Sequence, residues 1–362
     1  MDWFRTYRSN TLGGTGNQQY FNAPKSMTGR SYYRVFAGGS HRYSLLFCGA
    51  IDSTYKPEYE SYANLPCGPW EILEASVGIC REVSMETPGE VTEWIPLTFR
   101  GQPGIRLQPG ETVTSDPVTL SPEKDAYICC QATYRGQRIP CHLESVLPIF
   151  VQRDGQWIPA KQVPVPSMVG CDRPVKACIG FLGDSITQGI GTPPNGYTHW
   201  CALVSQALGE KYAYWNLGLG YGRAQDAASD GAWLWKAKQC DAVVVAYGSN
   251  DIGRGRSLEQ IKRDMTAIVE KLKEAGIPVF LISVPPFDWK EAYLQRWKGI
   301  NEYLREDLSR KAEGFFDVAP LLTDKTSEGV ALYGTHPNEE GCRLWAEGML
   351  PLFREFLRRN NV

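Results

Sequence analysis

The chain of 362 residues contains no long run of apolar side chains. No stretch approaches the roughly 20 apolar residues that a membrane-spanning helix needs, and the first residues, MDWFRTYRSNTLGG, lack the apolar segment of a signal peptide. An excess of charge is lacking too, because 38 basic side chains stand against 40 acidic ones. We therefore expect a cytoplasmic protein whose partners are neither nucleic acids nor membranes.

The sequence also lacks the spacing of metal ligands. Its four histidines and eleven cysteines are scattered, and no pair at zinc-ligand spacing has a matching second pair. We therefore predict no metal and no cofactor. The odd number of cysteines in so long a chain argues against a disulfide scaffold, so we expect reduced and mostly buried thiols. His41, His142 and His199 are interpreted as structural residues.

The length of the chain favours two domains. From about Tyr32 to Trp157, short alternating apolar runs such as RYSLLFCGAI, WEILEASVGIC and DAYICCQATY are separated by Gly, Pro, Asn and Asp. This pattern predicts an all-β sandwich of the jelly-roll kind over residues 1–160. The proline-rich stretch KQVPVPSMVGCDRP shows neither the alternation of a strand nor the three-to-four spacing of a helix. We therefore predict a linker over residues 161–175.

Residues 176–362 show a different pattern, in which apolar strands alternate with stretches able to form helices. The apolar runs are ACIGFL, YAYWNLG, DAVVVAYGSND, PVFLISVPP and FFDVAP. Such nearly continuous apolar strands predict a parallel sheet covered by helices on both faces. The apolar stripe from Leu258 to Ala275, at spacings of three and four, predicts one of those helices. Ligands of such sheets bind at the carboxyl ends of the strands.

Four polar blocks follow this pattern in the places where a ligand is expected. Asp184 and Ser185 after the first strand could simply cap the next helix, but the ordered set makes coincidence a poor explanation. The blocks are GDSI at 183–186, NLGLG at 216–220, GSND at 248–251 and HPN at 336–338. Together they favour a catalytic site over a helix cap alone.

These blocks resemble the SGNH (GDSL-type) hydrolases, whose name gives a Ser, a Gly, an Asn and a His in four blocks. The resemblance runs from about Val175 to the C-terminus and rests on GDSITQG, YGSND and THPNEEG. It implies an α/β class domain with a flavodoxin-like, three-layer α/β/α architecture. The β-rich half resembles the jelly-roll modules of two-domain bacterial carbohydrate acetylesterases in this family.

The chemistry of ester cleavage explains the residue types. A serine hydroxyl needs a neighbouring base to attack a carbonyl, so Ser185 is the predicted nucleophile and His336 its general base. The oxyanion needs fixed donors, and the resemblance assigns them to the Ser185 N–H, the Asn250 amide and a backbone N–H of the second block. The family places a Gly five residues after the Asn, where this chain has Tyr221. The donor is therefore Gly220 or Tyr221, and residue type favours Gly220.

A second departure concerns the group that orients the imidazole. Many relatives carry an Asp three residues before the His, where this chain has Tyr333. The backbone carbonyl of Tyr333 can take that role, and Asp324 or Glu328 are the alternatives. Asp184 is expected to support the site as a helix cap.

The predicted function is hydrolysis of small acyl esters, above all O-acetyl groups on oligosaccharides, with Trp289 as a candidate sugar-binding side chain. Two enzymatic alternatives are O-acyl transfer by the same Ser–His pair and cleavage of short-chain esters that are not carbohydrates. A third alternative is a glycan-binding β domain carried beside an inactive α/β domain. The intact Ser185, Asn250 and His336 argue against inactivity.

Overall fold

The computed structural model describes residues 2–52, 67–142, 146–229 and 232–362. The chain divides into two compact units, one of Met1–Val175 with Ala213–Trp215, the other of Lys176–Tyr212 with Asn216–Val362. Within the described residues, no helix combines the length and the apolar character needed to span a bilayer.

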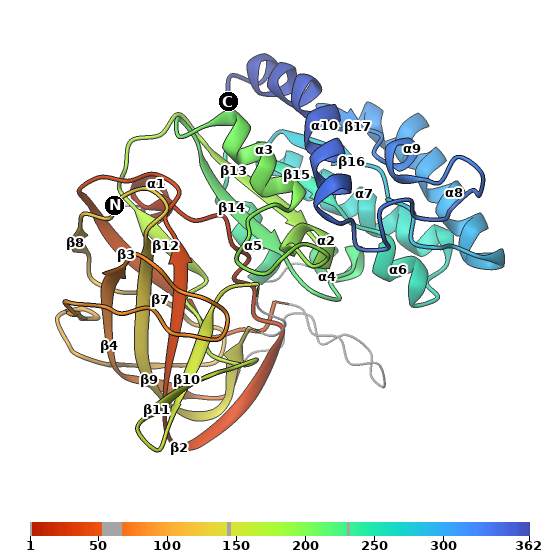
Figure 1. Ribbon diagram of the computed structural model, residues 1–362. Coiled ribbons are helices and arrows are strands. Elements are labelled where there is room, and N and C mark those ends of the chain that lie inside the picture. Colours follow the sequence, from red (N-terminus) through yellow and green to blue (C-terminus); the bar gives the residue numbers. More distant parts are fainter. Residues whose placement is uncertain (1, 53–66, 143–145, 230–231) are drawn as a thin grey trace. The chain divides into compact units, whose positions relative to one another are not determined.

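The first unit is built from two antiparallel sheets, drawn in red to yellow in Figure 1. Three long strands pair side by side in the larger sheet, with β9 between β2 and β4. The strands of the larger sheet are β2 (Gln19–Arg34), β4 (Trp70–Cys80), β5 (Ile95–Leu97), β6 (Ile105–Leu107), β9 (Tyr127–Cys141), β10 (Ile149–Arg153) and β11 (Gln156–Pro159). Those of the smaller sheet are β1 (Arg8–Ser9), β3 (His41–Cys48), β7 (Thr112–Thr114), β8 (Val118–Leu120) and β12 (Met168–Cys171). The predicted β-sandwich is confirmed.

The core of this unit follows from the alternation that the sequence shows. Tyr32 on β2, Cys129 on β9 and Phe150 on β10 are fully buried in one cluster. The rings of Tyr32 and Phe150 meet edge-on with centroids 5.8 Å apart. Burying large aromatic side chains of this kind supplies much of the apolar area that stabilises a sandwich.

The stretch predicted as a linker contains a strand. β12 lies between β1 and β3 and forms antiparallel ladders with both. The prolines at 164 and 166 precede this strand instead of breaking it, and MVGC pairs along its whole length. The prediction of a linker over 161–175 is therefore wrong for Met168–Cys171, and the first unit extends to Val175.

The second unit is an α/β domain around a five-stranded sheet of order β14-β13-β15-β16-β17. Its strands are β13 (Cys178–Gly183), β14 (Ala213–Gly218), β15 (Ala242–Ala246), β16 (Val279–Ile282) and β17 (Gly314–Phe316). β13, β15, β16 and β17 pair in parallel. Every residue of β13 is buried, as expected for a strand covered on both faces. This is the predicted flavodoxin-like order, with the first strand between the second and the third.

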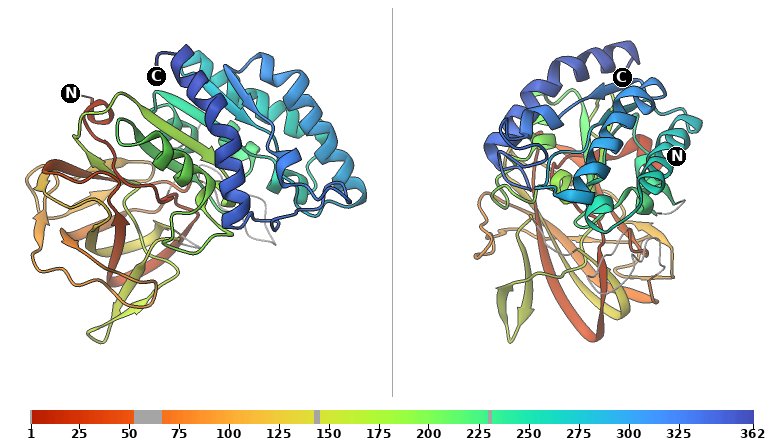
Figure 2. Two further views of the ribbon diagram at one scale, coloured as in Figure 1. Left: turned by 45° about the horizontal axis from the view of Figure 1, so that its top comes forward. Right: turned by 90° about the vertical axis from the view of Figure 1, so that its right-hand side faces the viewer.

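Helices lie on either side of this sheet, and Figure 2 shows them around the strands. α3 packs against α10, while α7 contacts both α4 and α8. The helices are α2 (Ser185–Gln188), α3 (Trp200–Leu208), α4 (Ala224–Ala228), α5 (Ala232–Ala237), α6 (Ser249–Gly253), α7 (Leu258–Glu274), α8 (Glu291–Glu306), the 3₁₀ turn η1 (Leu308–Arg310), α9 (Ala319–Leu322) and α10 (Glu339–Arg359). The first unit contributes one more short helix, α1 (Trp3–Thr6).

The predicted helical stripe is confirmed in α7. Ile261, Met265, Ile268 and Leu272 are all fully buried. The helix begins after Ser257, whose hydroxyl accepts the Gln260 N–H, and the Gln260 side chain accepts the Ser257 N–H in return. This reciprocal cap supplies the start signal that the stripe alone does not give.

The expectation of buried, reduced cysteines is confirmed. All eleven lie in the described ranges, all are buried, and none forms a disulfide. Burial raises the pKa of several thiols, for example that of Cys80 to about 11. These thiols stay protonated at neutral pH and behave as small apolar side chains.

Candidate active site

Ser185 is the first residue of α2, and only Asp184 separates it from the end of β13. Asp184 caps this helix, since its carboxylate accepts the Ile186 N–H at 2.9 Å. A Cβ at Gly183 would lie 2.1 Å from the Thr187 hydroxyl oxygen and 2.8 Å from the Ala246 carbonyl oxygen, so only glycine fits there. Asp184 and Ser185 are therefore adjacent but have different roles. Asp184 caps the helix and fixes the turn, and this turn positions the candidate nucleophile Ser185.

The Ser185 hydroxyl lies 2.9 Å from Nε2 of His336, although the two residues are 151 positions apart. His336 stands just before α10, whose N-terminus is capped by the Asn338 side chain through the Gly341 N–H. This distance is that of an ordinary hydrogen bond. A hydroxyl and an imidazole in this contact can act as nucleophile and general base.

The imidazole of His336 is half-buried, and burial lowers its pKa below the usual value of 6.5. The neutral ring, which can accept a proton, therefore prevails at neutral pH. The ring of Phe287 meets the imidazole at 73° with centroids 5.3 Å apart. Phe287 thus packs against one side of the imidazole of the candidate base.

None of the predicted orienting groups is found bonded to His336 in the described part of the chain. The Tyr333 carbonyl accepts the Asn338 N–H at 2.9 Å, and no bond from it to Nδ1 of His336 is found among the described residues. The Asp324 carboxylate accepts the N–H and the hydroxyl of Thr326, each at 2.7 Å. Glu328 forms an ion pair with Lys298 at 2.5 Å. The Asp324 and Glu328 carboxylates thus bond Thr326 and Lys298, and neither is bonded to His336.

The second block packs closely onto α2. A Cβ at Gly218 would lie 2.1 Å from the Gln188 nitrogen, so this residue must be glycine. The Gly220 N–H donates to Oε1 of Gln188 at 2.5 Å. The preference for Gly220 as an oxyanion donor is therefore corrected, because a side-chain acceptor already occupies its N–H. Tyr221 follows in the left-handed region at φ 61°, and the Gly222 N–H bonds the Leu219 carbonyl at 2.9 Å.

Asn250 lies in the first turn of α6, and its Nδ2 donates to the Gly222 carbonyl at 3.0 Å. An amide nitrogen carries two hydrogens, so this bond fixes the side chain and leaves a second donor. Gly248 before the helix has φ 132°, and a Cβ there would lie 2.5 Å from Val284. The turn of the YGSND block thus needs its glycine, and the Asn250 side chain is held in place by the Gly222 carbonyl.

Buried carboxylates lie directly beside these blocks. Burial is the main cause that raises the pKa of Asp184 to about 7, and the neighbouring Asp251 adds to it. Burial likewise raises the pKa of Asp251 to about 6, although the hydrogen bond from the Ala224 N–H lowers it in part. The Arg256 guanidinium lies 3.6 Å from Asp251. The sequence showed Asp251 within YGSND but gave no sign that it would be fully buried.

Trp289 lies beneath the site surface and has an exposed fraction of only 5%. Its ring is 5.4 Å from Phe287 and 6.5 Å from Tyr293. So deep a ring has little free face for a sugar. The aromatic residue that contacts His336 is Phe287, two positions before Trp289. The sequence VPPFDW did not indicate which of its two aromatic side chains would lie beside the histidine.

Two of the remaining histidines are core residues. His142 is fully buried, with Nδ1 2.6 Å from the Gly16 carbonyl, and burial lowers its pKa to about 4. His199 is 4% exposed, precedes α3, and has Nε2 3.3 Å from the Asn216 amide. Their predicted structural character agrees with this burial.

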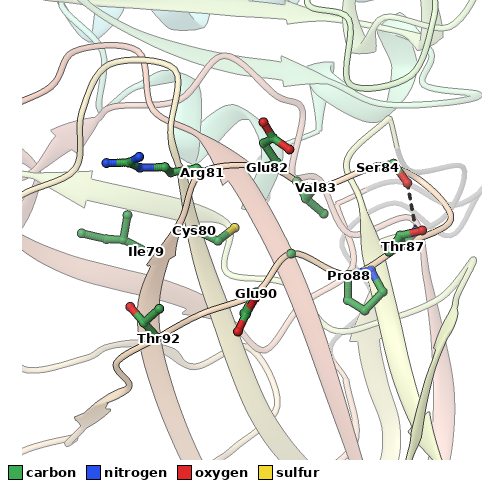
Figure 3. A pocket seen from close by; sticks show the side chains of 11 residues that line it. Ile79, Cys80, Arg81, Glu82, Val83, Ser84, Thr87, Pro88, Glu90 and Thr92 are labelled. Carbon is green, nitrogen blue, oxygen red and sulfur yellow. Dashed lines mark hydrogen bonds between the residues drawn. The ribbon is translucent and has the colours of Figure 1, made fainter.

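A separate hollow of about 910 Å³ lies in the β unit, at the end of β4 and the loop that follows it (Figure 3). Its wall includes Arg81, Glu82 and Glu90, while Ser84 bonds the Thr87 backbone N–H at 2.9 Å. None of the residues predicted for catalysis lines this hollow.

The chain is similar to several known proteins. The sequence model of the GDSL-like lipase/acylhydrolase family matches residues 181–344, and no curated protein matches the chain. A member of the lipolytic protein G-D-S-L family from Veillonella parvula is 22% identical, covering 49% of this chain and 98% of its own (TM-score 0.42). A family two carbohydrate esterase from Cellvibrio japonicus is 12% identical and covers 97% of both chains (TM-score 0.41).

A carbohydrate esterase family 2 enzyme with a carbohydrate binding domain, from Corynascus thermopiles, is 16% identical and covers 97% of this chain and 99% of its own (TM-score 0.41). The family match spans the Ser185, Asn250 and His336 blocks, and the fold brings Ser185 and His336 of these blocks into contact. Residues 181–344 form a GDSL-like lipase/acylhydrolase domain.

Proposed function

We propose that this protein is a serine esterase that removes small acyl groups, above all O-acetyl groups, from oligosaccharides. The observation that carries the proposal is the hydrogen bond of 2.9 Å between the Ser185 hydroxyl and Nε2 of His336. This pair lies in an acylhydrolase domain at the carboxyl end of β13, the place where doubly wound sheets bind ligands.

The reaction proceeds through an acyl-serine intermediate. His336 Nε2 takes the hydroxyl proton as Ser185 Oγ attacks the ester carbonyl, and the imidazolium then protonates the departing alcohol. Water attacks the acyl-enzyme in the second half, again with His336 as base. The carbonyl oxygen becomes negative in each tetrahedral intermediate. The Ser185 N–H at the start of α2 and the second hydrogen of the Asn250 amide are the proposed donors.

The carbohydrate part of the proposal rests on the surroundings of the base. Phe287 presents a half-buried ring beside His336, and an apolar ring face suits the C–H face of a sugar. The formal net charge of −2 supplies no strong field that would select an ionic substrate. A neutral acylated sugar fits both features.

The proposal is tested by incubating the protein with a panel of acetylated oligosaccharides and following acetate release by NMR. Ser185→Ala serves as the matched control, because it deletes one oxygen and no packing. We expect acetate release from the parent and none above background from the variant. Turnover of a chromogenic acetate ester without release from any sugar would restrict the protein to other short-chain esters. No turnover of either substrate would refute esterase activity.

A parallel reaction with a free sugar acceptor tests acyl transfer. Hydrolysis predicts acetate as the product whether or not the acceptor is present. A new acetylated sugar that replaces acetate would instead assign the same Ser–His pair to a transferase.

A further inference from the structure

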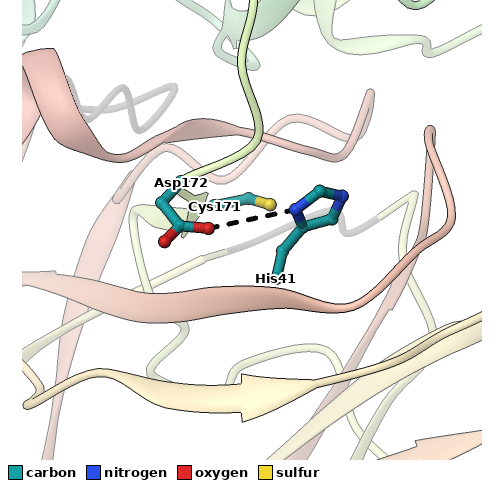
Figure 4. Close-up of side chains that lie close together, drawn as sticks. All are labelled: His41, Cys171 and Asp172. Carbon is teal, nitrogen blue, oxygen red and sulfur yellow. Dashed lines mark ion pairs between the residues drawn. The ribbon is translucent and has the colours of Figure 1, made fainter.

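Three side chains of different chemistry meet at one end of the smaller β sheet. One is the first residue of β3, one is the last residue of β12, and one follows it directly: His41, Cys171 and Asp172. Their ligand atoms all lie within 4.8 Å of one another. Figure 4 shows the Cys171 sulfur beside the line that joins His41 to Asp172.

The spacing of these atoms suits an ion between them better than a direct contact. Nδ1 of His41 lies 4.0 Å from Oδ1 of Asp172, beyond the ordinary limit of about 3.2 Å for a hydrogen bond. A tetrahedral zinc ion with bonds of about 2.0–2.3 Å holds its ligands roughly 3.3–3.8 Å apart. The His41 and Asp172 side chains are 21% and 28% exposed, and ion binding requires both to rotate toward the ion.

The backbone holds the three positions rigidly. Cys171 is paired on both sides, with Arg8 of β1 and with Tyr43 of β3. Asp172 is tied to Arg42 twice, because its N–H bonds the Arg42 carbonyl at 3.0 Å and its Oδ1 accepts the Arg42 N–H at 2.9 Å. Ligands carried by paired strands and held by outer hydrogen bonds form a more exact site than ligands on loops.

The turn before β3 determines which nitrogen of His41 faces the cluster. Gly39 has φ 126°, and a Cβ there would lie 2.9 Å from Nε2. The turn therefore covers Nε2, while Nδ1 is the nitrogen near Asp172. An alanine at residue 39 would disturb the ring by both strain and contact.

We propose that His41, Cys171 and Asp172 form a binding site for Zn²⁺ or a divalent cation of similar softness. A thiolate, an imidazole and a carboxylate are the ligand types of zinc, whereas magnesium and calcium take oxygen alone. Binding replaces the thiol proton of Cys171, which passes to solvent, so that one metal–sulfur bond forms for one S–H bond broken. The fourth position is left for water. The ion joins the end of β12 to the start of β3.

The test uses the full-length protein, stripped with a chelator, dialysed, and titrated with Zn²⁺ or with Co²⁺ as a spectroscopic probe. We expect one Zn²⁺ per chain, a rise in the thermal unfolding midpoint on adding Zn²⁺, and a thiolate-to-cobalt charge-transfer band with Co²⁺. His41→Ala and Asp172→Asn should each weaken binding at least about tenfold. Cys171→Ser should remove the cobalt band.

Two controls keep the outcome clear. Cys48→Ser changes a buried thiol at the other end of β3, and Asp154→Asn changes an exposed acid in a turn; both should bind as the parent does. His41 and Asp172 are partly exposed, so their variants keep the test valid even where Cys171→Ser fails to fold. Absence of stoichiometric binding by the parent overturns the proposal. Parent-like binding by His41→Ala and Asp172→Asn also overturns it, because the metal then sits elsewhere.

Discussion

Gln188, the last residue of α2, accepts the Gly220 N–H through its side chain at 2.5 Å. The helix that begins with the candidate nucleophile is thus tied at its other end to the loop of the second block. Gln188 is fully buried, so water cannot replace the lost acceptor. The contact makes Gln188 a positioning residue for the turn that contains Tyr221.

We expect Gln188→Ala to lower the free energy of unfolding by about 1–3 kcal/mol, because it leaves a buried N–H without its acceptor. Denaturant unfolding followed by circular dichroism measures this change. Gln206→Ala is the matched control, since that side chain is exposed and donates to the Tyr197 carbonyl at 3.1 Å. Its cost should stay within about 0.5 kcal/mol. Equal losses of unfolding free energy in the two variants would show that the Gln188–Gly220 hydrogen bond does not stabilise the fold more than an exposed one.

Ser185→Ala and His336→Ala should each abolish ester hydrolysis, and the double variant should be no worse than either single one. The two side chains act as one unit, so their losses do not add. Steady-state kinetics on a chromogenic acetate ester, with circular dichroism as the check on folding, measures the three rates. A Ser185→Ala rate within about tenfold of the parent would remove Ser185 as the nucleophile.

Asn250→Ala should lower kcat about a hundredfold to a thousandfold with little change in KM, because an oxyanion donor acts on charge that exists only in the transition state. The bond from Asn250 to the Gly222 carbonyl is lost as well. Asn250→Asp retains the size of the side chain and separates packing from donation. If Asn250→Asp kept the parent rate, or if only KM changed, Asn250 would have no part in stabilising the oxyanion.

The fold was predictable because its signals are local. The continuous apolar strands and the stripe of α7 require no knowledge of distant residues, and both appear where expected. The strand Met168–Cys171 was missed because its partners Arg8 and Tyr43 lie far away in the sequence. A short strand between prolines shows its pairing only in the folded sheet.

The site was predictable only in part, for the same reason. The GDS, GSND and HPN blocks named Ser185, Asn250 and His336, because the chemistry restricts residue type and order. The bond between Gln188 and Gly220, the burial of Trp289 and the place of Phe287 beside His336 depend on packing between elements. A Gln inside GDSITQG carries no signal that its side chain will hold a loop 32 residues later.

The buried carboxyl of Asp184 should make stability depend on pH. Its folded pKa of about 7 lies above the ordinary value of 3.8, so the folded state binds the extra proton. The resulting stabilisation is complete below about pH 4 and is lost as the pH rises through about 7. Asp184→Asn retains an acceptor for the Ile186 N–H and cannot ionise. We expect it to flatten the pH dependence of unfolding between pH 4 and 8.

Unfolding midpoints of both proteins across this range provide the measurement, with Asp154→Asn, an exposed turn residue, as the control that should keep the parent profile. Asp251, with a pKa raised to about 6, contributes in the same direction. Some slope should therefore survive in Asp184→Asn. A parent-like slope in that variant would mean that Asp184 stays ionised in the folded protein.

The last prediction concerns the group that orients His336. The Asp324 carboxylate is bound to Thr326, Glu328 is paired with Lys298, and the Tyr333 carbonyl accepts the Asn338 N–H. Among the described residues no carboxylate is bonded to the imidazole, which is hydrogen-bonded to the Ser185 hydroxyl and packs against Phe287. Asp324→Ala and Glu328→Ala should each change kcat/KM by no more than a few fold. Tyr333→Phe should leave kcat/KM unchanged, because the main-chain oxygen still accepts the Asn338 N–H.

Phe287→Ala should lower kcat/KM more than any of these three substitutions, by about tenfold to a hundredfold. The change removes the packing that keeps the His336 imidazole aligned with Ser185. Loss of a true triad carboxylate behaves differently, since the wrong tautomer costs about ten-thousandfold in a well-studied serine protease. Kinetics of the four variants on one acetate ester therefore separate the two arrangements. A thousandfold loss in Asp324→Ala or Glu328→Ala, with Phe287→Ala near the parent rate, would mean that an acid moves to His336 during catalysis and completes a triad.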